Sequence, residues 1–260
     1  MPELIDTHCH LAHGRLRQQL AGVFDRARAA GVGRMICATG TIHESKAALS
    51  LAHQHDFLWC TAGLHPHDAK EAGPNYLDAI ERLAADAKNV AVGEIGLDYH
   101  YDFSPREDQR RVFSEQLDLA RRLGKRIVIH TREAFDETMA ILLASGVAGE
   151  GVVLHCCTED AANVRRALDW GATISFSGIV TFKKTGYLRE AARIVPDGRL
   201  LIETDSPFCS PEPVRKMRTN EPAHVAHVAA RLAAVRNTTP EAIAELTGAA
   251  AVRFFGLDEL

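Results

Sequence analysis

Histidines with a regular spacing follow the first apolar run of this 260-residue chain, where they could bind a metal ion. His8 and His10 form an H-x-H pair directly after Leu4–Thr7. Residues i and i+2 of a strand point to the same side, so both imidazoles could reach one metal ion. Taken alone, the pair is equally compatible with histidines that have a structural role.

Four further ligand-type residues follow apolar runs in the same way. They are Glu94, His130, His155 and Asp205. If the runs are parallel strands whose carboxyl ends open on one face, all six side chains meet there. Four imidazoles and two carboxylates exceed the needs of one four-coordinate ion and suit two divalent ions that share a carboxylate and a water. The sequence therefore predicts a two-metal site with Glu94 as the bridge.

Short apolar runs, each followed by an amphipathic helical pattern, must position these residues. The eight predicted strands are Leu4–Thr7, Arg34–Thr39, Leu58–Leu64, Val90–Ile95, Arg126–Ile129, Val152–Leu154, Ala172–Phe176 and Leu200–Glu203. Eight such units in about 250 residues predict an α/β protein, a (β/α)8 TIM barrel, with additional C-terminal helices at Ala223–Arg236 and Pro240–Phe255. The alternative is an open doubly wound sheet, which should carry a glycine-rich loop after an early strand; here that strand leads into Thr7-His-Cys-His10.

Composition limits the classes of protein that this chain can be. With 46% hydrophobic and 25% charged residues, it is typical of a folded, water-soluble protein, and we expect residues 1–260 to form one domain. The six cysteines are scattered and include no C-x-x-C pair, which favours reduced thiols in a cytosol. The N-terminus lacks the pattern of an export signal, and no apolar run is long enough to span a membrane. We expect a cytoplasmic protein without membrane attachment, and no stable protein partner is inferred.

A net charge of −4 argues against binding a polyanion over a broad face, so any such partner must be held locally. Two divalent ions with the Glu94 and Asp205 carboxylates give the site a charge of about +2. Several basic residues are expected on the same barrel face, where they would bind substrate, although each alone is equally typical of a solvated surface. They are Arg132, Lys183, Lys184, Arg215, Lys216 and Arg218.

Seven motifs occur in the order found in the TatD family of metal-dependent deoxyribonucleases, which the chain resembles from about residue 4 to residue 256. They are Thr7-His-Cys-His10, Gly63-Leu-His-Pro-His67, Gly93-Glu-Ile-Gly-Leu-Asp-Tyr99, Ile129-His-Thr-Arg132, Leu154-His-Cys156, Ser177-Gly-Ile-Val-Thr-Phe182 and Glu203-Thr-Asp-Ser-Pro207. The resemblance implies an amidohydrolase-type TIM barrel with two divalent ions (Zn, Mn or Mg). It also implies hydrolysis of phosphodiester bonds in DNA, often from the 3′ end, with single-stranded DNA as the expected substrate.

Carried over residue by residue, the resemblance assigns the six ligands to two ions. His8, His10, Glu94 and Asp205 would hold one ion, and Glu94, His130 and His155 the other. Asp205 would also orient and deprotonate the attacking water, the alternative being a ligand with no proton-transfer role. His65 would lie near the substrate phosphate, whereas His67 could cap the helix that follows.

The chain departs from the family pattern around the expected substrate. Cys157 stands where an aromatic residue is usual, Phe208-Cys209 replaces Tyr-Leu, the loop at Lys216-Met217 lacks the common glycine, and Ala250 replaces Asn. The Cys156 and Cys157 thiols are either metal or redox ligands or, as the complete ligand count favours, small residues that pack behind His155. Two alternatives to a nuclease stay open: a hydrolase of an ester, lactone or amide, such as an aminoacyl-nucleic-acid deacylase, and a non-catalytic metal or nucleic-acid binder.

Overall fold

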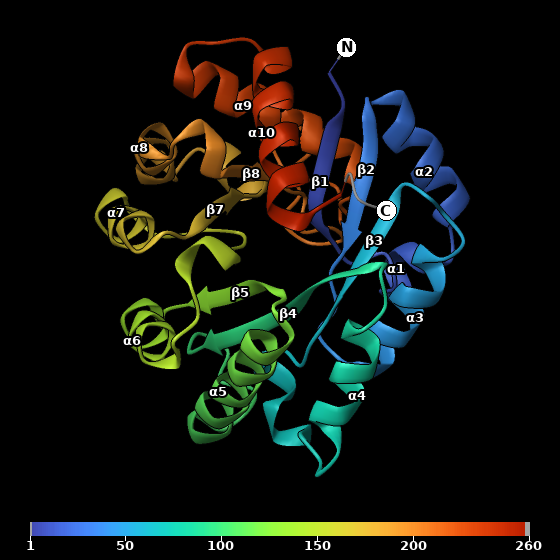
Figure 1. The fold of residues 1–260 in the computed structure, drawn as a ribbon. Coiled ribbons are helices and arrows are strands. Elements are labelled where there is room, and N and C mark those ends of the chain that lie inside the picture. Colours follow the sequence, from blue (N-terminus) through green and yellow to red (C-terminus); the bar gives the residue numbers. More distant parts are fainter. Residues whose placement is uncertain (1, 258–260) are drawn as a thin grey trace.

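The computed structural model describes residues 2–257, within which eight parallel strands form one sheet in the order β1 to β8. The strands are β1 (Leu4–Cys9), β2 (Val32–Cys37), β3 (Leu58–Ala62), β4 (Asn89–Asp98), β5 (Arg126–Arg132), β6 (Val152–Leu154), β7 (Thr173–Phe176) and β8 (Leu200–Ile202). The helices are α1 (Gly14–Arg17), α2 (Leu20–Ala29), α3 (Ile42–Ala52), α4 (Tyr76–Ala84), α5 (Arg106–Leu123), α6 (Phe135–Ser145), α7 (Ala161–Trp170), α8 (Gly186–Ile194), α9 (Val225–Arg236) and α10 (Pro240–Phe255). Helices α2 to α9 lie around the outside of the strands (Figure 1).

The first and last strands approach each other and nearly close the sheet. The His10 N–H donates to the Ser206 carbonyl (2.7 Å), and the Asp205 N–H donates to the His8 carbonyl (2.9 Å). Below them, the Thr204 hydroxyl donates to the buried Asp6 carboxylate (2.6 Å). The predicted TIM barrel is therefore confirmed, and the open doubly wound alternative is wrong.

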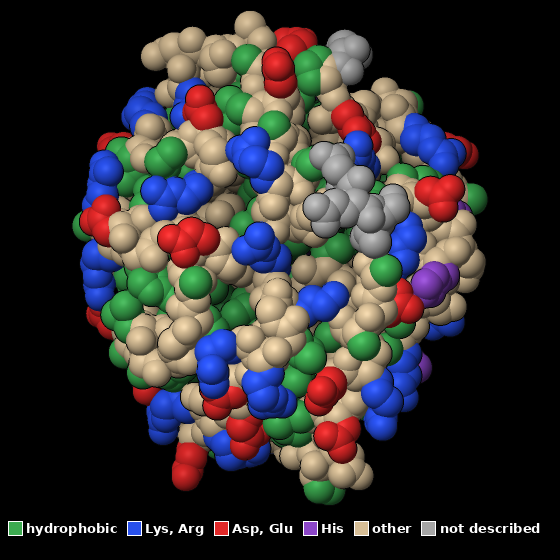
Figure 2. Space-filling model, viewed as in Figure 1, with side chains coloured by type: hydrophobic (Ala, Val, Ile, Leu, Met, Phe, Trp, Pro, Cys, Tyr) green, Lys and Arg blue, Asp and Glu red, His purple; other side chains and the backbone are tan. Residues whose placement is uncertain are grey.

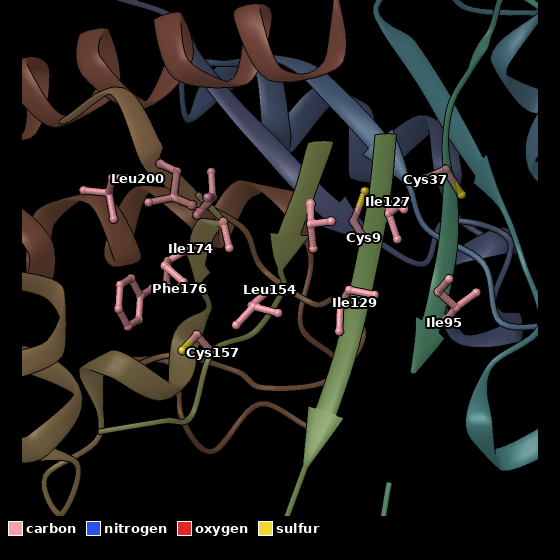
Figure 3. Close-up of a cluster of buried hydrophobic side chains, with 14 of the residues drawn as sticks. Cys9, Cys37, Ile95, Ile127, Ile129, Leu154, Cys157, Ile174, Phe176 and Leu200 are labelled. Carbon is pink, nitrogen blue, oxygen red and sulfur yellow. The ribbon is translucent and has the colours of Figure 1, made fainter. Parts of the chain in front are cut away.

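Within the described residues, every strand except β7 contributes side chains to two different apolar clusters. On β5, Ile127 and Ile129 belong to the cluster between sheet and helices, whereas Val128 belongs to a second cluster inside the barrel. Figure 3 shows members of the outer cluster, such as Ile174 and Phe176 of β7. This two-sided burial explains why the strands read as continuous apolar runs.

Helix α10 covers the inner cluster. Its side chains Ala250, Ala251, Phe254 and Phe255 pack with inward residues from every described strand except β7, and the helix lies across the middle of the view in front of β1 (Figure 1). Thr239 caps its first turn by accepting from the Ala242 N–H, and Gly256 ends it at φ 68. The helix therefore occupies its predicted range and seals one end of the barrel.

The strands that carry the candidate ligands are longer than predicted. β4 continues to Asp98 rather than ending at Ile95, β5 continues to Arg132 rather than Ile129, and β1 continues to Cys9 rather than Thr7. The predicted helix at Ala223–Arg236 is a 3-10 turn, Pro222–His224, followed by α9. Strand ends are hard to predict here because polar ligand residues inside a strand resemble the loop that follows it.

The surface seen in Figure 2 carries interspersed basic and acidic side chains rather than a region of one charge. This mixture fits the small net charge of −4. None of the helices within residues 2–257 has both the length and the apolar character needed to cross a bilayer.

Candidate metal centre

Strand alternation directs two of the candidate ligands into the barrel. His130 and His155 lie two residues beyond Val128 and Val153, which belong to the inner cluster, so all four share the inward direction. His130 is still part of β5, whereas His155 follows β6 directly. The imidazoles therefore form a polar layer above the apolar residues that fill the barrel.

Glu94 enters this layer because β4 is irregular. Val92 and Ile95 both belong to the outer cluster although they are three residues apart, and the pairing with β5 shifts between them. The irregularity turns Glu94 inward, as a β-bulge does. Gly96 is essential nearby, since a Cβ there would lie 1.9 Å from the His130 carbonyl oxygen. The prediction that Glu94 ends its strand is thus wrong: it lies mid-strand.

The two carboxylate oxygens of Glu94 face two different groups of imidazoles. Oε2 lies 3.2 Å from His8 Nε2 and 3.7 Å from His10 Nε2. Oε1 lies 2.8 Å from His130 Nδ1 and 2.7 Å from His155 Nε2. The carboxylate thus stands between two donor groups, with one oxygen directed at each.

Asp205 joins the group around His8 and His10. Its Oδ1 lies 3.4 Å from His10 Nε2, and its backbone N–H is held by the His8 carbonyl. Ligand atoms of His8, His155 and Asp205 also lie within 4.8 Å of one another. All six predicted metal ligands therefore converge on one cluster in the structure.

The donor set fits divalent cations. His8 Nε2 and His10 Nε2 approach to 3.3 Å, and His130 Nδ1 and His155 Nε2 to 3.4 Å, so the nitrogens of each pair are directed at a common region. Within the described residues, His8 Nδ1 is buried without a hydrogen-bond partner. Clustered imidazole nitrogens and carboxylate oxygens are the ligands that zinc and similar ions prefer.

Two carboxylates behind the cluster orient its imidazoles. Asp98 Oδ2 lies 3.0 Å from His130 Nε2 and 2.9 Å from His67 Nε2, while Glu203 Oε1 lies 3.1 Å from His155 Nδ1. In the neutral form that would hold a metal ion, each imidazole would donate a hydrogen bond to its carboxylate, and His130 and His155 would keep a lone pair on the nitrogen that faces Glu94. Sequence reasoning missed both carboxylates, although they lie in the motifs Gly93–Tyr99 and Glu203–Pro207.

Burial and the neighbouring imidazoles act in opposite directions on these acids. Burial raises the pKa of Glu94, but its electrostatic interactions and hydrogen bonds with the surrounding histidines outweigh burial and hold the pKa well below its ordinary value. Burial likewise raises the pKa of Asp98, and hydrogen bonds from His130 and His67 reverse the shift. Both carboxylates are therefore ionised and available as acceptors.

His65 also reaches the cluster, but with a different tautomer. Its Nδ1 accepts the His67 N–H at 3.1 Å, capping the 3-10 turn Pro66–Glu71, and burial lowers its pKa to about 4. A neutral ring with an accepting Nδ1 carries its proton on Nε2, which lies 3.2 Å from Glu94 Oε1. The His65 ring is thus a hydrogen-bond donor toward Glu94 Oε1. The predicted capping role belongs to His65 and not to His67, which lies inside the turn.

A cavity of about 710 Å³ opens above the cluster. Five of the six candidate ligands line it, together with His65, Arg132 and Arg215. Among the residues that the structure describes, Lys183, Lys184, Lys216 and Arg218 do not line this cavity. The volume is that of a typical small-ligand site.

Aromatic side chains paired with arginines stand at the rim of this cavity. Arg132 lies over the ring of Tyr101 (4.7 Å) and Arg215 over that of Phe182 (4.0 Å). Tyr101 is 47% exposed and stacks on Phe103, which is 55% exposed. Phe208, 42% exposed, lines the cavity as well. Half-exposed rings beside cationic groups form flat surfaces that another ring can stack on.

Known proteins resemble this chain over nearly its whole length. Residues 5–256 match the family model described as TatD related DNase. The uncharacterized metal-dependent hydrolase YabD of Bacillus subtilis is 37% identical over 98% of this chain and all of its own length. The 3′-5′ ssDNA/RNA exonuclease TatD of Citrobacter koseri is 36% identical over 98% of this chain and 99% of its own. The crystal structure of the TatD homologue YJJV from Escherichia coli superposes with a TM-score of 0.91 at 28% identity, covering 97% and 98% of the two chains.

Proposed function

The chain belongs to the TatD-related DNase family and is a metal-dependent hydrolase, and from this premise we propose that it is a nuclease that hydrolyses single-stranded DNA from the 3′ end. The observation that carries the proposal is the Glu94 carboxylate, whose oxygens face two separate groups of imidazoles. Pairs of divalent ions bridged in this way are typical of enzymes that cleave phosphate esters.

The proposed cofactor is two divalent ions. His8, His10, Glu94 Oε2 and Asp205 would hold one ion, and Glu94 Oε1, His130 Nδ1 and His155 Nε2 the other. When bound, the ions supply Lewis acidity toward the phosphate and a water of lowered pKa. Imidazole-rich ligands suit Zn²⁺, whereas Mn²⁺ and Mg²⁺ are often used in phosphoryl chemistry, so the chemistry of the ligands supports all three.

Asp205 is the proposed proton acceptor for the attacking water. Its carboxylate lines the cavity, and its Oδ1 faces His10 while its Oδ2 accepts the Cys209 thiol proton at 3.2 Å. Burial raises the pKa of Asp205, but the hydrogen bond from His10 and the charges of the surrounding histidines outweigh burial and lower it, so the group is ionised before the reaction. An ionised carboxylate beside the water can hold its proton until the leaving oxygen departs.

His65 and two arginines are the proposed phosphate contacts. The Nε2–H of His65 points into the cavity beside Glu94 and can donate to a phosphate oxygen. Arg132 and Arg215 line the same cavity and supply fixed positive charge. Lys183 and Arg218 lie outside the set of lining residues, and we propose that they contact phosphates further along the strand.

The aromatic rim supports a nucleic acid rather than a small ester as substrate. Tyr101 and Phe208 line the cavity with rings that are half exposed. Base–aromatic stacking contributes about 1–3 kcal/mol per base and requires bases that are not already paired. Single strands present such bases, and duplexes do not.

A metal panel crossed with a substrate panel tests the proposal. Single-stranded DNA labelled at the 5′ end, the matching duplex, RNA, aminoacyl-RNA, a lactone and a simple ester would each be incubated with Zn²⁺, Mn²⁺ or Mg²⁺. We expect a ladder of products shortened stepwise at the 3′ end of single-stranded DNA, and loss of this ladder in Glu94→Ala. Cleavage of the ester, lactone or aminoacyl-RNA with intact DNA under every metal would overturn the proposal in favour of the related hydrolase.

A further inference from the structure

Cys156 and Cys157 are neighbours in the chain but face different surroundings. The Cys157 side chain is buried in the outer cluster with Phe176 and Ile174 (Figure 3). Cys156, in a left-handed turn with φ 42, lines the cavity, and its Sγ lies 3.0 Å from the Ser177 hydroxyl. The predicted packing behind His155 therefore describes Cys157, whereas the role of Cys156 requires another explanation.

A second thiol, that of Cys209, meets Cys156 at the cavity wall. Cys209 also has a left-handed backbone, with φ 51, and its Sγ donates to Asp205 Oδ2 at 3.2 Å. The two sulfurs and an Asp205 oxygen all lie within 4.8 Å of one another. The other four cysteines of the chain are buried. Two cavity-lining thiols thus share one carboxylate.

The segment that carries Cys209 is held closely in position. A Cβ at Gly178 would lie 2.0 Å from the Cys209 carbonyl oxygen, so only glycine permits this approach. On the other side, the Phe208 N–H donates to the Asp205 carbonyl at 2.9 Å. The arrangement of the two thiols therefore results from backbone packing and not from flexible side chains alone.

We propose that Cys156, Cys209 and Asp205 form a third cation site for a thiophilic divalent cation such as Cd²⁺ or excess Zn²⁺, and that this site shares the Asp205 carboxylate with one of the two proposed hydrolytic ions. Two sulfurs and one carboxylate oxygen supply three ligands, and the cavity supplies water for a fourth. Binding releases the two thiol protons to solvent, because thiolates and not thiols are the metal ligands. Ions that prefer oxygen, such as Mg²⁺, are excluded by the sulfurs.

Occupancy of this site has a consequence for the reaction. A cation on Cys156 and Cys209 draws the Asp205 carboxylate away from the water that it deprotonates and from the ion that it helps to hold under the proposed function, on which this consequence rests. Excess Zn²⁺ therefore inhibits hydrolysis through two cysteines that do not hold the hydrolytic ions.

Cadmium titration of the reduced, full-length protein tests the site. Thiolate–Cd²⁺ bonds give an ultraviolet charge-transfer absorption that imidazole and carboxylate ligands do not give. We expect this absorption in the wild type, its loss in Cys209→Ser and Cys156→Ser, and its retention in the matched control Cys157→Ala. Equilibrium dialysis should find one more Cd²⁺ per chain in the wild type than in Cys209→Ser.

Equal Cd²⁺ uptake and equal charge-transfer absorption in wild type and Cys209→Ser would overturn the proposal. The readout needs no enzymatic activity, so it stands or falls independently of the nuclease assignment. If DNA is cleaved, the ratio of rates at excess and limiting Zn²⁺ should be lower for the wild type than for Cys209→Ser. Circular dichroism checks that each variant is folded.

Discussion

Replacing Asp98 by asparagine should weaken the binding of one metal ion without replacing a proposed metal ligand. Asp98 Oδ2 accepts from His130 Nε2 and His67 Nε2, while Oδ1 accepts the backbone N–H groups of His100 (3.0 Å) and Tyr101 (2.9 Å). In Asp98→Asn, the amide oxygen can keep the two backbone bonds, but the NH₂ group then faces both imidazoles. His130 must present a lone pair at Nε2 and carry its proton on Nδ1, the atom directed at Glu94.

The magnitude follows from the loss of the lone pair on Nδ1. Mutation of a carboxylate that orients a metal-binding histidine typically lowers metal affinity about 10–100-fold, which corresponds to about 1.4–2.8 kcal/mol. The effect falls on the ion held by His130 and His155. The ion held by His8 and His10 should keep its affinity, because Asp98 does not contact those rings. Asp98→Asn should therefore bind one ion normally and the other weakly.

Competition with a graded series of chelators, read by elemental analysis, measures this difference. Asp102→Asn is the matched control, because Asp102 pairs with Arg106 on the surface and its loss should leave both ions in place. A thermal melt of the metal-free variants shows whether Asp98→Asn is folded. Retention of both ions by Asp98→Asn with wild-type affinity would refute the tautomer argument.

Three further predictions concern the bridge, the proton acceptor and the rim. Glu94→Ala should lose bound metal and nearly all hydrolytic activity while its circular dichroism spectrum stays native. If this variant kept two bound ions and wild-type activity, Glu94 would not be the carboxylate that the two ions share. Asp205→Asn should lower kcat far more than it raises KM, and an unchanged kcat would leave Asp205 as a ligand without a proton-transfer role. Tyr101→Ala should weaken single-stranded DNA binding about 5–100-fold, with little change in cleavage of bis-p-nitrophenyl phosphate. Arg215→Ala should reduce the log-salt slope of DNA binding by about 0.7. Arg121→Ala serves as the comparison outside the cavity, because Arg121 pairs with Asp118 on the surface of α5. Equal DNA binding by wild type and Tyr101→Ala would exclude stacking on that ring.

The order of strands and helices could be predicted well because each strand is buried on both faces and each helix on one. Continuous runs such as Arg126–Ile129 and amphipathic runs such as α5 therefore contrast clearly. The helix end at Gly124 was also predictable, since its left-handed conformation favours glycine. The strand ends were not, because His8 and His130 continue their strands as polar residues.

The convergence of six candidate ligands was predictable from barrel topology, but its geometry was not. Regular alternation would direct Glu94 outward, and only the irregularity between Val92 and Ile95 turns it in. Asp98 and Glu203 were missed because a carboxylate that supports a histidine looks the same in sequence as any other. Exposed positions such as Lys183 depend on loop conformation, which hydrophobic periodicity does not describe.

The contact between the first and last strands affects when this protein can begin to work. The Asp6–Thr204 hydrogen bond joins residues 198 positions apart. At a synthesis rate of about 5–20 residues per second, a ribosome makes Thr204 on the order of 10–40 s after Asp6. His8 and His10 are made early, whereas Asp205, which lies beside them in the cluster, is made almost 200 residues later. A polypeptide released before that point would lack Asp205, one of the six proposed metal ligands, and we expect it to lack the proposed hydrolytic activity.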